Sequence, residues 1–117
     1  MDLARVGKDS VKQFEVYLCD LEPSVDSEIR KVRPVAIVSP NEMMRLRTIV
    51  TAPLTTTIKG WPSRIAVRFR NRDGEIALDQ IRTVDKSRLR KRLGRIDEAT
   101  AKLVCARLCQ MFEYINS

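Results

Sequence analysis

The chain has 117 residues, carries 22 Lys and Arg against 15 Asp and Glu, and contains no His, which gives a formal net charge of +7. A chain of this length predicts one domain, residues 1–117, with a core of its own. The absence of His excludes Ser-His-Asp hydrolases, ribonucleases that use two histidines and most catalytic zinc sites. No apolar run reaches the ~18 residues of a membrane helix. The first residues lack the apolar stretch of a signal peptide, so we expect a cytoplasmic protein with no membrane partner.

The positive charge is concentrated in the middle of the chain. Residues 43–96 hold 14 Lys and Arg against 4 Asp and Glu, whereas residues 1–42 and 97–117 each carry a small acidic excess. One electropositive surface favours a polyanion such as nucleic acid, because each phosphate that it neutralises releases counterions. An ordinary solvated basic face fits the same composition.

The three cysteines, Cys19, Cys105 and Cys109, do not form a metal-binding pattern. Cys105 and Cys109 lie four residues apart, but without His or a second Cys pair the ligand set is incomplete. We therefore expect no metal site and no cofactor, and reduced thiols that are buried as small apolar side chains.

The first third of the chain predicts two strands separated by a loop. Residues 1–12 are polar and aperiodic, which indicates a loose N-terminal extension. Alternation over residues 14–21 predicts the first strand, and a polar, charged loop follows to residue 31. The continuous apolar run at residues 34–38 predicts a strand buried on both faces.

The next segment predicts a helical turn, a strand and a second loop. Residues 41–46 suit a helical turn with Asn41 as its cap. Residues 48–54 are rich in β-branched side chains and predict a third strand, whose end Pro53 should place at an edge or a bulge. Residues 55–63 read as a polar loop.

The basic middle segment predicts a hairpin and a short helix. Residues 64–70 alternate cleanly, Asp73-Gly74 is a turn signal, and residues 75–81 should return as the partner strand. Residues 82–95 suit a short basic helix that ends at Gly94. The basic side chains of the alternating strand, which would either track phosphates or form a solvated face, are Arg64, Arg68 and Arg70.

The last predicted element is an amphipathic helix with Asp97 as its N-cap. Its apolar stripe should pack in the core or in a dimer interface, and consists of Val104, Leu108, Met111, Phe112 and Ile115. Several short strands with one terminal helix predict a mainly β fold with α (α+β), built on a small, strongly bent sheet or barrel.

Five blocks of sequence, in this order, resemble the MazF/PemK family of toxin endoribonucleases over about residues 14–115. They are LEPSVDSE at 21–28, RP at 33–34 followed by SP at 39–40, APLT at 52–55, KGWP at 59–62 and LDQIRTVD at 78–85. The chain departs from the family where Phe14-Glu15 replaces the usual Gly-Asp and where Asp26 replaces a glycine. Loss of that glycine changes the φ and ψ angles open to the loop.

The resemblance implies a small SH3-like barrel of the CcdB/MazF kind, with a C-terminal amphipathic helix and short additional helices, in a homodimer. It implies the toxin of a type II toxin–antitoxin system, a sequence-specific endoribonuclease that cleaves single-stranded mRNA without metal and inhibits translation and growth. The expected products carry 2′,3′-cyclic phosphate and 5′-hydroxyl ends. The expected partners are RNA and a cognate, MazE-like antitoxin whose extended segment blocks the RNA groove.

The resemblance places Arg33 and Thr55 at the catalytic site. A guanidinium is permanently cationic and matches phosphate oxygens, and a threonine hydroxyl can orient a phosphate or a 2′-hydroxyl. Kid-type members carry a basic residue two positions before the Asp of the Asp-Gln pair, and Ala77 stands there in this chain. The MazF-type pair of Arg33 and Thr55 is therefore preferred.

We expect auxiliary or RNA-binding roles for Ser27, Glu28, Lys59, Trp61, Asp79 and Gln80. Glu28 is the first candidate for the proton acceptor, although pairing with Arg33 would keep the pKa of Glu28 low and make it a better positioner than base. Trp61 would either stack on a base or cap the end of the barrel. Gln80 would either read a base edge or brace the sheet.

Two other functions fit the same fold. One is a non-enzymatic gyrase poison like CcdB, whose action depends on a tryptophan-bearing C-terminal segment, whereas residues 112–117 of this chain contain no Trp. The other is an inactive relative that only binds an antitoxin, which the Asp26 replacement permits.

Overall fold

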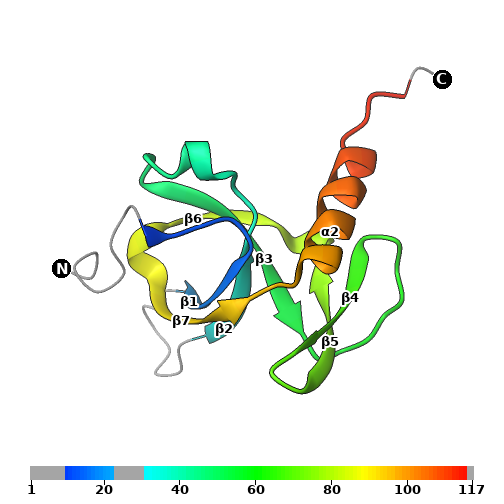
Figure 1. The fold of residues 1–117 in the computed structure, drawn as a ribbon, viewed down its shortest axis with the longest axis horizontal. Helices are drawn as coiled ribbons and strands as arrows, with labels where there is room; N and C mark the ends of the chain where they lie inside the picture. Colours follow the sequence, from blue (N-terminus) through cyan, green and yellow to red (C-terminus); the bar gives the residue numbers. More distant parts are fainter. Residues whose placement is uncertain (1–9, 23–30, 116–117) are drawn as a thin grey trace.

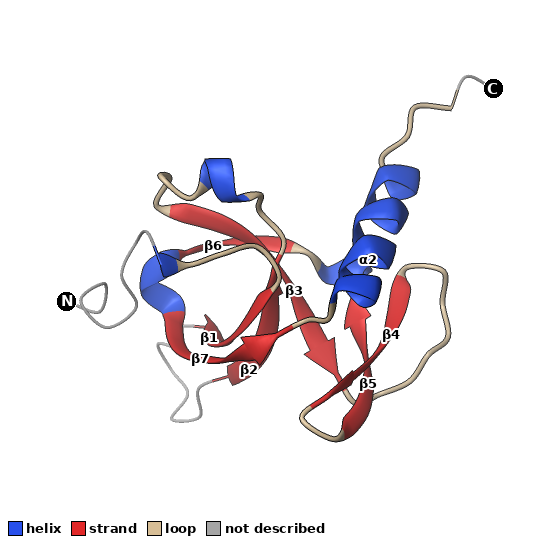
Figure 2. Ribbon diagram, viewed as in Figure 1, coloured by secondary structure: helices blue, strands red, loops and turns tan. Residues whose placement is uncertain are grey.

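The computed structural model describes residues 10–22 and 31–115 of the chain. Figures 1 and 2 show a bent antiparallel sheet with one long helix, α2 (Glu98–Met111), after its last strand. The strands are β1 (Glu15–Glu22), β2 (Lys31–Ile37), β3 (Thr48–Thr55), β4 (Arg64–Phe69), β5 (Arg72–Ala77), β6 (Arg82–Asp85) and β7 (Leu89–Arg95). Three 3-10 turns join them, η2 (Asn41–Met43), η3 (Leu78–Gln80) and η4 (Lys86–Arg88). The expectation of a mainly β fold with a C-terminal helix is confirmed.

Strand β3 connects the two halves of the sheet. The strands follow the order β4-β5-β3-β2-β1-β7, and β6 pairs with β3 beside that path. Pro53 lies in β3 opposite Val35, two residues before the strand ends, and on its other side it stands at an interruption in the pairing, close to the expected edge or bulge. On the other side of β3, the partner changes from β6, up to Thr51, to β5, from Leu54 onward. A residue without an N–H fits this change of partner, because no ladder bond is required of it there.

The sheet carries apolar side chains on both faces. Strand β2 is buried on both sides, as predicted, since Val35 and Ile37 join one cluster and Ala36 the other. The first cluster consists of Val11, Tyr17, Cys19, Leu21, Val35, Ile37, Met44, Ile49, Val84 and Leu89. The second consists of Phe14, Val16, Ala36, Ala52, Leu54, Ile65, Val67, Ile76, Leu78, Ile96 and Val104.

The β4–β5 hairpin turns at Arg70 and Asn71, not at Asp73-Gly74. Both turn residues have positive φ angles, 52° and 64°, as two-residue hairpin loops require. Gly74 instead lies within β5 opposite Val67, where a Cβ would collide with the backbone carbonyl of Thr55. The glycine thus serves the close approach of β5 to the end of β3. Strand β5 ends at Ala77, earlier than expected, and η3 follows.

The predicted helix over residues 82–95 is also wrong, since this segment forms β6, η4 and β7. Leu89 and Leu93, on which the prediction rested, pack in different apolar clusters, because the register between β1 and β7 shifts along this strand. Strand β7 pairs with β1, and its arginines bond to carboxylates there: Arg90 to Asp20 at 3.0 Å and Arg92 to Glu15 at 2.9 Å. The pairing of β7 with β1, which the local sequence pattern does not reveal, therefore favours a strand over the predicted helix.

The N-terminal part of the described chain is packed rather than loose. Residues 1–9 of the predicted extension lie outside the described residues, but Val11 is buried in the first apolar cluster. Asn41 does not cap the turn that it begins, because η2 has Pro40 as its N-cap. The Asn41 Oδ1 instead accepts a hydrogen bond from the backbone N–H of Gln13 at 2.8 Å, and so ties η2 to the segment before β1.

Helix α2 lies against β4 and is anchored at its start (Figure 1). Asp97 is its N-cap, as predicted, and accepts a hydrogen bond from the Thr100 N–H at 3.1 Å. Of the predicted stripe, Val104 is buried and Leu108 partly buried. Core packing is wrong for its last three members, whose exposed fractions are 37% for Met111, 68% for Phe112 and 72% for Ile115. No helix within residues 10–22 and 31–115 is both long and apolar enough to cross a membrane.

The three thiols have different surroundings. Cys19 is buried as predicted, and desolvation by burial raises its pKa to about 11, so the thiol is neutral. Cys105 and Cys109 are exposed on α2, so the expectation of burial is wrong for them. Burial, and secondarily Cys109, raises the pKa of Cys105. The raised pKa values disfavour a reactive thiolate at Cys19 and at Cys105.

Candidate nucleic-acid interface

Arg33 and Thr55 lie near the same end of two neighbouring strands. The β2–β3 ladder ends at the pair of Val35 and Pro53, and Arg33 and Thr55 each lie two residues beyond it. Beyond that pair, Arg33 is opposite Cys19 of β1 and Thr55 is opposite Glu75 of β5. Both are partly buried. Among the described residues, Arg33 has no ion-pair partner, which leaves its guanidinium available to an anion.

A third residue, Glu75, lies beside Thr55 on the neighbouring strand β5. The β3–β5 ladder pairs Thr55 with Glu75, which is only 4% exposed. Sequence analysis missed Glu75, although a signal was present: an acidic residue directly before the apolar run Ile76 to Leu78. A buried carboxylate needs partners, and these partners define the site.

The Glu75 carboxylate binds the backbone of the loop over residues 56–63. Its Oε1 accepts from the Lys59 N–H at 3.1 Å and its Oε2 from the Gly60 N–H at 2.9 Å, while Arg64 Nη1 donates to Oε1 at 3.2 Å. Burial acts to raise the pKa of Glu75, but the Gly60, Lys59 and Arg64 donors outweigh it and hold this pKa below its usual value. The carboxylate is therefore ionised at neutral pH and anchors the loop.

Arg64 is buried at the centre of this network, so its predicted place on a phosphate-tracking or solvated face is wrong. Its Nε donates to Asp79 Oδ1 at 2.8 Å, and its guanidinium carbon lies 4.7 Å from the centre of the Trp61 ring. Hydrogen bonding to Asp79 is the main reason that the pKa of Arg64 is raised. Its neighbours on the strand differ: Arg68 is exposed and pairs with Asp73 at 2.8 Å.

Lys59 and Trp61 form the exposed part of the anchored loop. Trp61 is 48% exposed, and the Lys59 Nζ lies 5.5 Å from the centre of its ring. A tryptophan that capped the end of a barrel would be buried, so the structure does not support that interpretation. Two cations beside a half-exposed indole make a surface on which a base could stack.

Asp79 and Gln80 lie in η3, directly after β5. Asp79 accepts hydrogen bonds from Arg64 and from the Ser63 hydroxyl at 2.8 Å, and the Arg64 bond is the main cause that lowers the pKa of Asp79. Asp79 therefore braces the end of the loop. Gln80 is exposed, so the interpretation of a half-buried brace is wrong for it. Ser27 and Glu28 lie outside the described residues.

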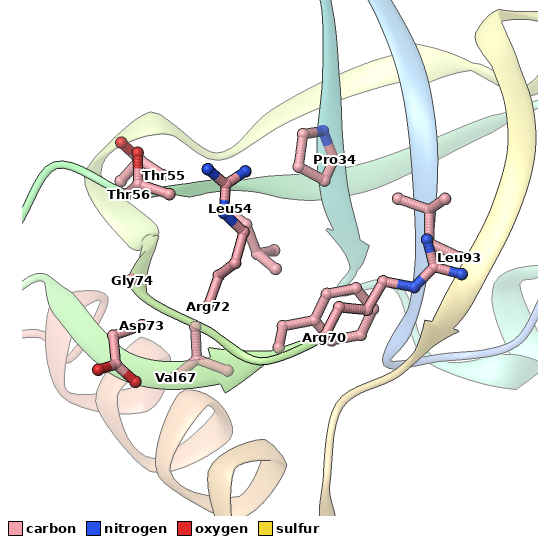
Figure 3. Close-up of a pocket in the computed structure, with 11 residues that line it drawn as sticks. Pro34, Leu54, Thr55, Thr56, Val67, Arg70, Arg72, Asp73, Gly74 and Leu93 are labelled. Carbon is pink, nitrogen blue, oxygen red and sulfur yellow. The ribbon is translucent and has the colours of Figure 1, made fainter.

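A cavity of about 190 Å³ opens beside the end of β3. Its walls include Pro34, Leu54 and Thr55. Figure 3 shows Arg72 extending toward Thr55 and Thr56 at one side of this cavity, and Arg70 beside Leu93 at the other. The cavity therefore adjoins the candidate catalytic threonine.

Part of the basic charge of the middle segment is paired with carboxylates within the protein. The arginines of residues 43–96 in such pairs are Arg47, Arg64, Arg68, Arg90 and Arg92. Each of these ion pairs offsets one positive charge, so the basic surface is weaker than the composition of the segment suggests.

Comparison with known proteins identifies relatives along nearly the whole described chain. A family model described as PemK-like, MazF-like toxin of type II toxin-antitoxin system matches residues 12–112. The chain is 35% identical over 95 residues to Endoribonuclease EndoA of Bacillus subtilis (strain 168), covering 75% of this chain and 82% of that protein. It is 32% identical over 96 residues to Endoribonuclease MazF of Staphylococcus epidermidis, covering 76% and 80%.

Solved structures agree with this relationship. An endoribonuclease from Mycobacterial species in complex with its cognate antitoxin superposes with a TM-score of 0.75 at 27% identity, over 92% of this chain and 99% of that one. MazF of Deinococcus radiodurans, at 19% identity, has the same fold, with a TM-score of 0.73 over 89% and 97%. From its sequence and its fold, the chain belongs to the MazF/PemK family of toxin endoribonucleases of type II toxin–antitoxin systems.

Proposed function

We propose that this toxin cleaves single-stranded mRNA at short specific sequences in the cytoplasm, without a metal ion, and so stops translation and growth. The 2′-hydroxyl attacks the adjacent phosphorus, the bond to the 5′-oxygen breaks, and the products end in a 2′,3′-cyclic phosphate and a 5′-hydroxyl. The observation that supports this proposal is that Arg33 and Thr55 lie at the same end of two paired strands, each two residues beyond the Val35–Pro53 pair.

Arg33 and Thr55 would divide the work at the phosphate. The Arg33 guanidinium stabilises the negative charge that builds on the phosphate oxygens, and loss of one preorganised donor of this kind costs about 3–4 kcal/mol of transition-state stabilisation. The Thr55 hydroxyl accepts a hydrogen bond from the Thr57 N–H at 3.1 Å, which leaves its own proton to donate to a phosphate or 2′-oxygen. The same bond fixes the direction of the hydroxyl.

The two carboxylates of the network around Arg64 do not fit the role of proton acceptor. Glu75 is a poor base, because both of its oxygens already accept hydrogen bonds and its pKa is lowered. Asp79 is held by Arg64 and Ser63 in the same way. Glu28, in the loop before Arg33, remains our candidate for an auxiliary role in this proton transfer, and Ser27 beside it for a contact to RNA.

Away from the scissile phosphate, we assign the contacts with the RNA strand to the exposed side chains near Thr55 and Glu75. Trp61 supplies a stacking surface, Lys59 a charge for the phosphate backbone, and Gln80 donors and acceptors for a base edge. Asp79 has a bracing role instead, through Arg64.

The proposed partners are a cognate MazE-like antitoxin and a second copy of the toxin. Relatives have been crystallised with an antitoxin, among them the mycobacterial endoribonuclease and MazF of Deinococcus radiodurans with MazE. The exposed apolar end of α2, Met111 and Phe112, supports burial against another protein chain. We assign this end to the homodimer.

Cleavage by purified protein tests the proposal. A mixed-sequence RNA incubated with the toxin in EDTA should yield fragments with 2′,3′-cyclic phosphate and 5′-hydroxyl ends, and Arg33→Ala should slow this cleavage by about 10²–10³. Arg47→Ala is the matched control, because it removes the same charge from an exposed side chain at the opposite end of β3. Intact RNA with the wild-type toxin, or equal cleavage by Arg33→Ala, would contradict the proposal. Inhibition of gyrase with intact RNA would favour the CcdB-like alternative.

A further inference from the structure

The Glu75 network has an arrangement that fold stability alone does not require. We infer that Glu75 is a positioning residue that holds Lys59, Gly60 and Trp61 in a fixed conformation, so that this segment meets RNA as a preformed surface beside Thr55. The inference rests on the proposed function for the identity of the ligand, and on the structure alone for the order of the loop.

The first support is the target of the carboxylate. Glu75 uses one oxygen for the Lys59 N–H and the other for the Gly60 N–H, which are consecutive backbone groups in the middle of the loop. Gly60 has a positive φ of 70°, and a Cβ there would meet open space. The loop bends around the carboxylate. At Gly60 the hydrogen bond to Glu75 holds the loop, because the space beside the Gly60 Cα contains no packed side chain.

The second support is that the far end of the loop is pinned without Glu75. The Ser63 carbonyl accepts from the Leu78 N–H at 2.9 Å, and Arg107 of α2 donates to the Pro62 carbonyl. The Trp61 carbonyl accepts from the N–H of Arg64, whose guanidinium is itself bonded to Glu75. With β3 and the residues from Pro62 onward fixed, Glu75 decides the conformation of the short span between them, which includes Lys59 and Trp61.

The third support is the placement of Glu75 beside the proposed catalytic pair. Glu75 is the direct β5 neighbour of Thr55, so one pair of strands, β3 and β5, fixes the position of the anchored loop relative to the Thr55 hydroxyl. Arg64 then links the carboxylate to the underside of the Trp61 ring and to Asp79. A loop that is already ordered loses less conformational entropy when it binds, which strengthens binding without any new contact.

Trp61 is the only tryptophan of the chain, so its fluorescence reports on this loop directly. Glu75→Gln keeps the shape of the side chain but replaces two acceptor oxygens with one. We expect it to lower the fluorescence anisotropy of Trp61 and to raise its quenching by acrylamide about twofold. Asp73→Asn is the matched control, since it makes the same charge change on the same strand at an exposed surface pair, and should leave both signals unchanged.

Kinetics then separate positioning from general support of the fold. For a wild-type toxin that cleaves RNA, Glu75→Gln should raise KM about tenfold and leave kcat within twofold, because Lys59 and Trp61 contact the strand away from the reacting atoms. Unchanged KM and unchanged Trp61 anisotropy would overturn the inference, as would a fall in kcat at constant KM. If the wild-type toxin cleaves no RNA, the proposed function fails, and the anisotropy of the free protein still tests the positioning role.

A second variant guards against a Glu75→Gln protein that does not fold. Arg64→Lys keeps the positive charge but loses the planar fork that bridges Glu75 and Asp79. It should raise KM and acrylamide quenching in the same direction as Glu75→Gln, but by a smaller factor. Normal Trp61 anisotropy and normal KM in Arg64→Lys would overturn the inference.

Discussion

The loop over residues 56–63 and the C-terminal end of α2 both expose large side chains, but the two regions are built in opposite ways. The loop is polar in sequence, yet buried charges on Glu75 and Arg64 hold it from beneath. The end of α2 is apolar in sequence, yet Met111 and Phe112 are 37% and 68% exposed. An exposed surface that the fold has already ordered suits a flexible ligand such as RNA. An exposed apolar surface left uncovered suits another folded chain.

The largest expected effect of a substitution is on stability, and it concerns β5, the strand beneath the loop. Gly74→Ala should lower the free energy of unfolding by about 2–3 kcal/mol, because the new Cβ would displace the Thr55 carbonyl and the end of β3 with it. Chemical denaturation measures this. Gly60→Ala, in open space with a positive φ, should cost only about 1 kcal/mol. Equal effects of the two substitutions would contradict the close approach of β5 to β3.

Self-association should depend on the other region. Phe112→Asp should weaken the dimer at least tenfold, or about 1.4 kcal/mol, because it places a charge in an apolar interface. Analytical ultracentrifugation measures this. Leu103→Asp is the control: it changes an exposed apolar residue nine positions earlier, which is the opposite side of the helix. If Phe112→Asp associates like the wild-type protein, the end of α2 is not the dimer surface.

The smallest expected effect is the response of the loop to acid. The pKa values of Glu75 and Asp79 are lowered in the folded protein, so the stability that they contribute is present above the ordinary carboxyl pKa near 4 and is lost as the pH falls through the folded values. Trp61 anisotropy should therefore be flat from about pH 8 to 5 and fall below about pH 4. A change between pH 5 and 8 would show that another group controls the loop.

Local sequence pattern predicted the elements whose partners add nothing to the pattern. The alternation before Glu22, the apolar run around Ala36 and the cap at Asp97 are of this kind, and the structure confirms them. The segment 82–95 failed because its strands pair with the distant β1 and β3, and because register shifts along β7 remove the two-residue alternation that would have indicated a strand. The Asp73-Gly74 turn failed because the glycine is required for contact with Thr55 rather than for a turn.

The candidate site divides along the same line. Family motifs supplied Arg33 and Thr55, and the pairing of β2 with β3 brings both to the same end of the two strands. The positioning role inferred for Glu75 was beyond reach, because its hydrogen bonds join residues 11 to 16 positions apart that only the folded loop brings together. For the same reason Arg64 was expected on a surface, since alternation assigns a face to a residue but does not show that another segment covers it.

A double-substitution cycle on Arg33 and Thr55, measured by single-turnover cleavage of one RNA, tests the central claim most directly. If both side chains act on the same phosphate, Arg33→Ala alone should slow cleavage by about 10²–10³, and Arg33→Ala with Thr55→Val should be little slower than Arg33→Ala alone. Multiplying effects would show that the two side chains act independently, and would contradict a shared site at the end of β2 and β3.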